Sequence, residues 1–191
     1  MVKIWEVDLS KDELYADAWV IDRYLGFEWR QHLLRDKSQP RQLKELSVRI
    51  EADIFVGDYF EANSIPVVSE RVKNVLLAEV PEYVEFFPVQ VFHHGKERTK
   101  DSFFIMYIKE KTDCFDWEKS VYRASILNNG EKSMRSIHKL VLLEDRIEHK
   151  KIVRVAEVGF NIIAVREDLC QIILNSGAKS IEFKEPHQTL W

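Results

Sequence analysis

The first 60 residues contain one run of apolar positions at helical spacing, which predicts a short helix from Asp12 to Tyr24. The apolar positions of this run are Leu14, Ala18, Ile21 and Leu25. The segment from Trp29 to Arg35 is expected to add another helical turn or two. Pro40 fixes its own φ and restricts the residue before it, so residues 36–42 are expected to form a loop. Residues 46–50 are expected to form a strand.

Two further helices are predicted by apolar spacing together with signals at their ends. Ser69 is placed to accept a hydrogen bond from a backbone N–H of the first turn, and Glu70 adds negative charge there. Apolar side chains then recur at helical spacing until Pro81 ends the helix. The other helix is expected from Glu167 to Asn175, followed by Gly177, which readily adopts the left-handed conformation that closes a helix.

The remaining apolar runs predict strands. Tyr83–Phe92 and Phe103–Ile108 are apolar at nearly every position, so we expect an antiparallel pair in a sheet that is covered on both faces. Pro88 cannot donate to a ladder, which places it near an edge or at a bulge. Later strands are expected at residues 137–143, 152–158, 161–165 and 181–183. These elements predict an α+β fold with a largely antiparallel sheet packed against short helices.

A shift of the sequence by 97 residues aligns residues 65–86 with residues 162–183. The matched positions include Ile65 with Ile162, Glu70 with Glu167 and Phe86 with Phe183. A helix–strand unit that is used twice would give this pattern. Two unrelated amphipathic helices would share part of it, because their apolar spacing is the same. In the second copy Arg166 stands at the position of Ser69.

The composition is that of a folded globular protein with little net charge. A chain of 191 residues with 46% hydrophobic residues can bury a sizeable core. Its 28 basic and 32 acidic residues give a net charge of −4. The richest basic stretches, residues 96–100 and 146–154, are short and contain Glu97 and Glu148. A nucleic-acid partner is therefore not expected, because such a partner requires a basic surface.

The expected compartment is the cytoplasm. No apolar run approaches the length of about 20 residues that crosses a bilayer, and residues 1–6 lack the apolar stretch of a secretory signal. A membrane partner is not expected either. Cys114 and Cys170 are too few for a disulfide framework, so both are expected to be reduced thiols.

Two segments contain side chains of the kind that catalysis uses. His93 and His94 are adjacent, so they point in different directions on a strand, and no acidic or cysteine residue has a spacing that would complete a metal site. The segment Asp113–Glu118 places Cys114 among carboxylates, which oppose formation of a thiolate. With only six glycines, the chain has no glycine-rich phosphate loop. We therefore predict no catalytic, cofactor-binding or metal-ligating residues, and no cofactor.

The tryptophans are the other residues of interest, because large aromatic side chains often anchor protein interfaces. Most of them are expected to lie in the core. They are Trp5, Trp19, Trp29, Trp117 and Trp191.

Six motifs resemble the polymorphic-toxin immunity-protein family that was first catalogued as a domain of unknown function from a myxobacterium. In this sequence they are Ile65–Leu76, Val84–Val89, Asp113–Ser120, Ile137–Leu142, Ile162–Leu169 and Ser176–Phe183. The resemblance covers residues 60–186, whereas residues 1–55 carry little of it. The sequence departs from the family pattern at Arg166, where a small capping residue is common, and at Lys179-Ser180, which replace a glycine before the last strand.

The resemblance implies an intracellular bacterial protein that binds and neutralises a cognate toxin without catalysis, through a rigid complementary surface. It assigns no partner-contact residue and leaves the oligomeric state open. It further implies an immunity-like α+β domain of residues 61–191, on which a helical segment of residues 1–60 is expected to pack.

The alternative to a toxin-binding protein is a small enzyme that uses carboxylates such as Asp113, Asp116 and Glu118 with a histidine brought close by folding. A deep pocket with convergent polar groups and perturbed ionisable residues would favour the enzyme. An exposed patch without such groups would favour the binding protein.

Overall fold

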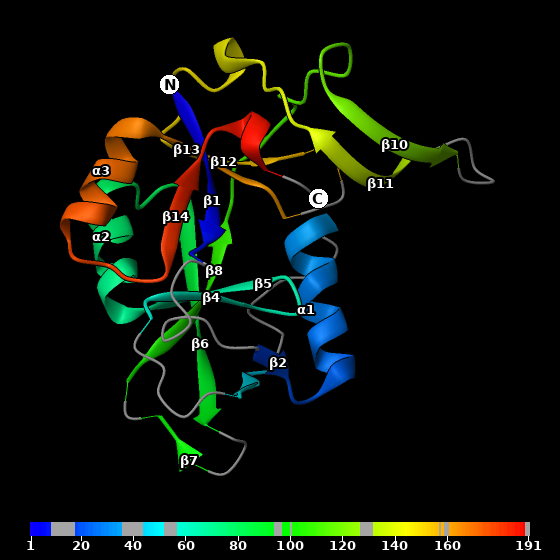
Figure 1. Ribbon diagram of the computed structural model, residues 1–191. Helices are drawn as coiled ribbons and strands as arrows, with labels where there is room; N and C mark the ends of the chain where they lie inside the picture. The colour runs from blue at the N-terminus through cyan, green and yellow to red at the C-terminus, as the bar shows by residue number, and fades with distance from the viewer. Residues whose placement is uncertain are drawn as a thin grey trace. The chain divides into compact units, whose positions relative to one another are not determined.

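The structure is a computed structural model that describes residues 1–8, 18–35, 44–51, 57–93, 97–99, 101–126, 132–156, 158 and 161–189 (Figure 1). The chain forms two compact units whose segments alternate along the sequence. Unit 1 comprises Met1–Glu6, Ile108–Cys170 and Phe183–Trp191. Unit 2 comprises Val7–Tyr107 and Gln171–Glu182.

Unit 2 contains a sheet that closes on itself into a barrel. Its strands are β2 (Ala18–Val20), β3 (Leu46–Ile50), β4 (Tyr59–Ala62), β5 (Ile65–Ser69), β6 (Val84–His93) and β8 (Phe103–Ile108). In the described part of the chain these strands follow the order β3-β2-β4-β5-β8-β6, and parallel pairing of β3 with β6 closes the ring. The short strand β7 (Glu97–Arg98) pairs with the end of β6. Closure removes the unpaired edges that an open sheet would expose.

Alternate residues of the strands fill the interior of the barrel. In β3, Leu46, Val48 and Ile50 are fully buried, whereas the intervening Arg49 is exposed. The other strands follow the same rule, because successive side chains of a strand point to opposite faces. Their residues in this core are Val20, Phe60, Ala62, Ile65, Val67, Val89, Val91, Phe103, Ile105 and Tyr107.

Helix α1 (Arg23–Arg35) packs one face against the barrel core. Trp29 and Leu33, each 1% exposed, lie in this core. Gly26 permits a close approach between the helix and β2, because a Cβ atom at this position would lie 3.0 Å from Val20 Cγ1. The helix thereby buries its largest apolar side chain, Trp29, in the core that it shares with the barrel.

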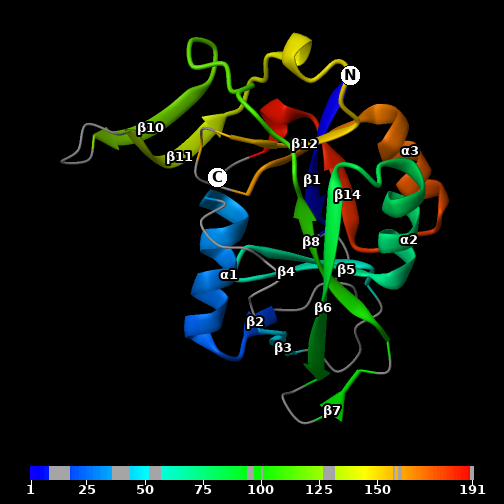
Figure 2. The same ribbon diagram turned by 180° about the vertical axis from the view of Figure 1, so that it is seen from behind.

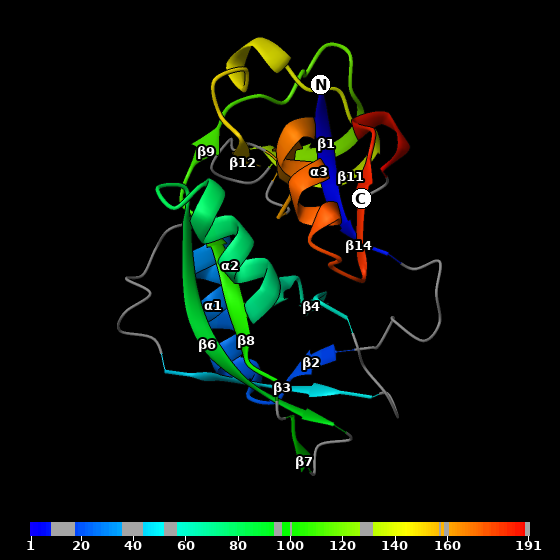
Figure 3. The same cartoon turned by 90° about the vertical axis from the view of Figure 1, so that its left-hand side faces the viewer.

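Helix α2 (Glu70–Glu79) confirms the helix predicted after Ser69. The Ser69 hydroxyl accepts a hydrogen bond from the Val72 N–H at 3.4 Å, and the helix ends at Val80, before Pro81. The helix contacts β5 and β6, and Figure 3 shows it lying over β6 and β8. The strands β6 and β8 are neighbours in the sheet, as their apolar character predicted.

Unit 1 is built around a sheet with the strand order β14-β1-β13-β12-β9. The strands are β1 (Val2–Val7), β9 (Lys111–Thr112), β12 (Ile152–Val155), β13 (Ile163–Arg166) and β14 (Ile181–Lys184). The pairs β1–β13 and β12–β13 are antiparallel, whereas β12–β9 is parallel. The core of this unit includes Ile4, Cys114, Phe115, Ile147, Val153, Ile162 and Ala164.

The strands β10 (Val121–Ile126) and β11 (Lys132–Lys139) form a separate antiparallel pair, which we call the arm. Figures 1 and 2 show the arm extending away from the other strands of unit 1. The arm packs against the core of unit 1 through Ile137, which is fully buried, and through the partly buried Tyr122 and Met134. Ile126, at the other end of β10, is 76% exposed.

The helix–strand unit is used twice, as the sequence offset predicted. Helices α2 and α3 (Glu167–Asn175) begin at Glu70 and Glu167, and the next strands, β6 and β14, begin at Val84 and Ile181. Both pairs of starting points follow the offset of 97 residues seen in the sequence. In each copy a third strand lies between the two strands of the unit: β8 between β5 and β6, and β1 between β13 and β14.

The third strands also share their register. Ser69 lies opposite Phe103, and its counterpart Arg166 lies opposite Val2. The N–H of Glu70 donates to the carbonyl of Ser102 at 3.2 Å, and the N–H of Glu167 donates to that of Met1 at 3.1 Å. The repeat is therefore structural, because it includes the third strands β8 and β1, which are not related by the offset of 97 residues.

Arg166 departs from the capping residue of the first copy and makes a different contact. Its guanidinium group donates two hydrogen bonds of 2.6 Å to the Asp168 carboxylate in the first turn of α3. This pairing lowers the pKa of Asp168 to about 2. The second copy thus starts its helix beside an ion pair, whereas the first starts with a hydroxyl cap.

The prediction for the N-terminal helix is wrong in its bounds. The structure has a strand at Ala18–Val20 and begins α1 at Arg23, whereas residues 12–17 lie outside the described residues. Asp22 explains the later start, because its Oδ1 accepts the N–H groups of Tyr24 and Leu25 at 3.0 and 3.1 Å. The segment 29–35 is helical and 46–50 is a strand, as expected, and the predicted loop at 36–42 lies outside the described residues.

Among the strands, the prediction for residues 137–143 is wrong in its bounds. The strand there, β11, ends at Lys139, and Leu142 instead forms a single bridge with Phe115. The strands β1, β2, β4, β7, β9 and β10 were not predicted. Pro88 is exposed and directly precedes Val89, the first residue of β6 that pairs with β3, which agrees with its inability to donate.

Residues 1–60 contain β1, β2, β3 and the start of β4 as well as α1. Residues 1–6 belong to unit 1 and residues 7–60 to unit 2. A domain boundary near residue 60 stays a prediction. In the described part of the chain, no helix is long and apolar enough to cross a membrane.

Candidate functional site

The acidic segment Asp113–Glu118 forms a turn in which its central carboxylate is already used. Asp116 Oδ1 accepts hydrogen bonds from the backbone N–H groups of Glu118 at 3.1 Å and Lys119 at 3.0 Å. The bond from Lys119, more than any other contact, lowers the pKa of Asp116. A carboxyl group held ionised by a turn stabilises that turn and is a poor proton donor near neutral pH.

The other candidate groups in this segment differ in their exposure to solvent. Cys114 is fully buried, whereas Asp113 and Glu118 are exposed. The backbone carbonyl of Asp113 accepts a hydrogen bond from Arg146 at 2.8 Å, which ties the segment to the following 3₁₀ turn, Glu144–Arg146. Neither cysteine forms a disulfide, and burial raises the pKa of Cys170 to about 12, so the environment of Cys170 disfavours a thiolate.

The structure describes only one residue of the histidine pair. His93 is half-buried at the end of β6, and His94 lies outside the described residues. Among the residues that the structure describes, no group of three or more His, Cys, Asp or Glu side chains could hold a metal ion.

A polar hollow of about 370 Å³ surrounds Asp58, Ser69 and Lys179 in unit 2. The Ser69 hydroxyl donates to Asp58 Oδ1 at 2.5 Å, and the Lys179 N–H donates to Asp58 Oδ2 at 2.8 Å. The Asp58 N–H donates in turn to the Lys179 carbonyl at 3.0 Å. Since both carboxylate oxygens accept hydrogen bonds within the protein, we interpret this cluster as a structural latch between β4, α2 and the segment before β14.

A second, larger hollow of about 620 Å³ lies beside β2 and α1 in unit 2. We call it the aromatic hollow. Its lining residues are Trp19, Val20, Ile21, Arg23, Gly26, Phe27, Arg30, Arg49, Glu51 and Asn63. It differs from the polar hollow because large apolar side chains are exposed in it.

The frame of the aromatic hollow is fixed by hydrogen bonds. The chain turns from β4 into β5 at Asn63 and Ser64, whose φ values of 52° and 64° fit a two-residue hairpin turn. The Asn63 side chain accepts the N–H of Val20 at 2.9 Å, and the N–H of Ile21 donates to the Ser47 carbonyl at 2.9 Å. The segment that carries Trp19 and Ile21 is thus held on both sides.

The exposed side chains of the aromatic hollow combine aromatic rings with positive charge. Trp19 is 41% exposed and Phe27 is 59% exposed. Arg23, Phe27 and Arg30 follow one another at helical spacing, so they form a stripe on α1. The lining residues include three arginines and one acidic residue, Glu51.

Exposed tryptophan and arginine in a hollow are typical of the residues that contribute most to protein interfaces. The positive excess favours a partner that presents carboxylates, since Arg can bind a carboxylate through two parallel hydrogen bonds. The arrangement is suited to binding another protein.

The sequence did not distinguish Trp19 from the core tryptophans. Trp5 and Trp29 are 2% and 1% exposed, as expected for most tryptophans, and Trp117 is half-buried against Phe115 and Tyr122. The spacing of Arg23, Phe27 and Arg30 predicts a shared face of a helix, but only if the helix is known to begin at Arg23.

A scan against family models matches the Immunity protein family (Imm11) over residues 10–188. The chain belongs to the Imm11 immunity protein family. The predicted family is thereby confirmed, and the Imm11 match extends to the N-terminal segment that showed little resemblance. A search of curated proteins finds no match. Membership in the Imm11 family supports a role in immunity to a toxin, and both the aromatic hollow and the arm lie within the matched residues.

Proposed function

We propose that this protein binds a cognate toxin and neutralises it as a stoichiometric complex, without catalysis, in the cytoplasm of the cell that makes both. The observation that carries the proposal is the exposed Trp19 in the aromatic hollow of a chain that belongs to an immunity family. Burial of one large aromatic side chain at the centre of an interface supplies a large share of the binding free energy.

The enzyme alternative loses its main support because Asp116 is used in a turn. A partner bound at the aromatic hollow, by contrast, would bury the exposed rings of Trp19 and Phe27, and burial of apolar area is the main source of affinity. We therefore place the toxin contact at the aromatic hollow.

The Trp19→Ala variant is expected to bind the toxin encoded by the adjacent gene about 30-fold more weakly or worse, which corresponds to a loss of about 2 kcal/mol. Titration calorimetry with the purified toxin domain measures this change. The matched control is Leu77→Ala on α2, because Leu77 is also 41% exposed but lies outside the hollow. The control is expected to change the affinity by less than about threefold.

Equal affinities of the two variants would contradict placement of the contact at the aromatic hollow. Failure of the wild-type protein to bind the toxin would contradict the proposed function itself.

A further inference from the structure

The arm carries charge of a single sign. Its strands contain four basic residues and no acidic residue; the basic ones are Arg123, Lys132, Arg135 and Lys139. Since the whole chain has a net charge of −4, the residues outside these strands carry −8. The arm is therefore a basic element of a protein whose other residues together carry a net negative charge.

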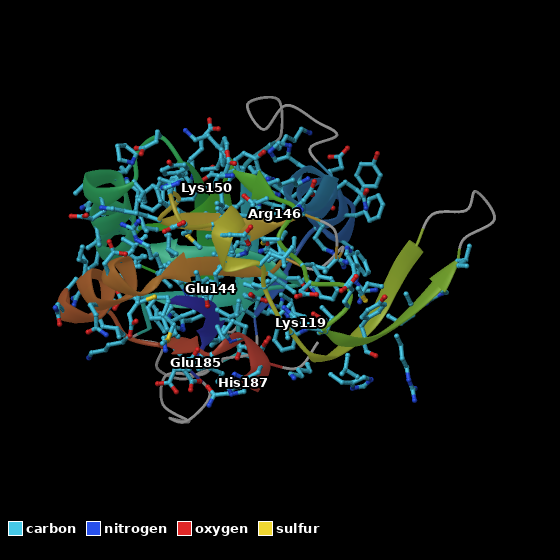
Figure 4. All side chains as sticks on the ribbon, turned by 90° about the horizontal axis from the view of Figure 1, so that it is seen from above. Lys119, Glu144, Arg146, Lys150, Glu185 and His187 are labelled. Atoms are coloured by element: carbon cyan, nitrogen blue, oxygen red, sulfur yellow. The ribbon has the colours of Figure 1, made fainter. Side chains whose placement is uncertain are left out.

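The arm also exposes apolar side chains. Ile126 is 76% exposed and Val121 is 53% exposed. Figure 4 shows the arm reaching outward past the labelled Lys119, with Glu144, Arg146 and Lys150 on the body of the same unit. A two-stranded hairpin is only marginally stable in water unless something packs against it. Among the described residues of the arm, Tyr122, Met134 and Ile137 pack against the core of unit 1.

Protection of the strand edges against aggregation does not explain these features. Charged side chains, lysine above all, do blunt exposed edges, but an isoleucine that is 76% exposed opposes that purpose. Pairing between the arms of two copies is disfavoured, because it would bring like charges together. A partner with an acidic face and an apolar centre fits both features.

We propose that the arm is a second contact surface of this protein and that it binds an acidic face of the cognate toxin. This inference rests on the proposed function. Nucleic acid is a poorer partner, because the charge of −8 on the other residues repels a polyanion. The arm acts chiefly on the rate of association, since exposed charges steer an encounter and are screened by salt.

The test reverses two exposed charges on the arm, Arg123→Glu and Lys139→Glu, in one protein. The association rate constant with the purified toxin domain is measured by stopped-flow fluorescence at 20 mM and at 500 mM NaCl. The control protein carries Lys44→Glu and Lys109→Glu, two exposed residues outside the arm that change the net charge equally. Circular dichroism melts establish that both variants fold.

At low salt the arm variant is expected to associate about 10-fold to 100-fold more slowly than the wild type, and the difference should largely vanish at high salt. The control is expected to remain within about threefold of the wild type, since its charges lie outside the arm. Equal slowing of both variants would overturn the inference, because net charge alone would then explain the effect.

Two other results would also overturn it. One is a wild-type association rate that does not depend on salt. The other is tight binding of a 20-base-pair DNA duplex that the arm variant loses, which would make nucleic acid the partner. A wild-type protein that does not bind the toxin at all would instead reject the proposed function.

Discussion

The Trp29→Ala variant is expected to lower the free energy of unfolding by about 3–5 kcal/mol. Trp29 is 1% exposed and belongs to the core of the barrel. Its ring lies edge-on to Phe87, with 5.2 Å between the ring centroids, and its Nε1–H donates to the Lys44 carbonyl at 3.2 Å. Truncation would leave a cavity between α1 and the barrel and would remove the partner of a backbone carbonyl.

Urea denaturation followed by circular dichroism measures this loss. Trp19→Ala serves as the matched control, because it removes the same side chain from a position that is 41% exposed. The control is expected to change the free energy of unfolding by less than about 1 kcal/mol. If both variants unfold at the same urea concentration, α1 does not pack into the barrel as the structure has it.

The Asp58→Ala variant is expected to lower the free energy of unfolding by roughly 3 kcal/mol. The Asp58 carboxylate accepts hydrogen bonds from the Ser69 hydroxyl at 2.5 Å and from the Lys179 N–H at 2.8 Å. Each hydrogen bond to a charged group contributes about 1.5–3 kcal/mol, and the backbone N–H of Lys179 would lose its partner. The Ser69 hydroxyl would also lose the contact that orients it as the cap of α2.

Thermal and urea unfolding of three variants separates a latch from a binding pocket. Asp58→Asn keeps an acceptor oxygen and is expected to lose less than Asp58→Ala. Asp101→Ala removes an exposed carboxylate from the same hollow and is expected to change stability by less than about 0.5 kcal/mol. Unchanged stability of Asp58→Ala would show that the cluster is not structural and would return the polar hollow to consideration as a functional site.

Local signals explain why α2 and α3 were predictable. Ser69 and Gly177 mark helix ends through their own chemistry, and Gly177 has the left-handed φ of 77° that was expected of it. The barrel was not predictable in this way. The barrel closes through parallel pairing between β3 and β6, in which Leu46 lies opposite Val89. These segments are far apart in the sequence, so their pairing leaves no local sequence pattern.

The candidate surfaces depend on the same long-range contacts. Trp19 and Trp29 are the same residue type ten positions apart, and only the pairing of β2 with β3 and the start of α1 at Arg23 expose one and bury the other. The basic character of the arm is divided in the sequence between residues 121–126 and 132–139, and becomes one surface only when the strands pair. Neither the exposure of Trp19 nor the charge of the arm could be read from the sequence. The family resemblance, by contrast, indicated the kind of partner, a toxin.

The stoichiometry of protection tests the central claim most directly. A fixed amount of the toxin encoded by the adjacent gene is mixed with increasing amounts of this protein, and the remaining toxin activity is measured after each addition. Neutralisation by binding predicts that activity falls in proportion to the added protein, reaches its minimum at one molecule per toxin, and that the two proteins then elute as one species. Full protection at far less than one molecule per toxin would contradict the claim, because each molecule would have inactivated many toxin molecules in turn.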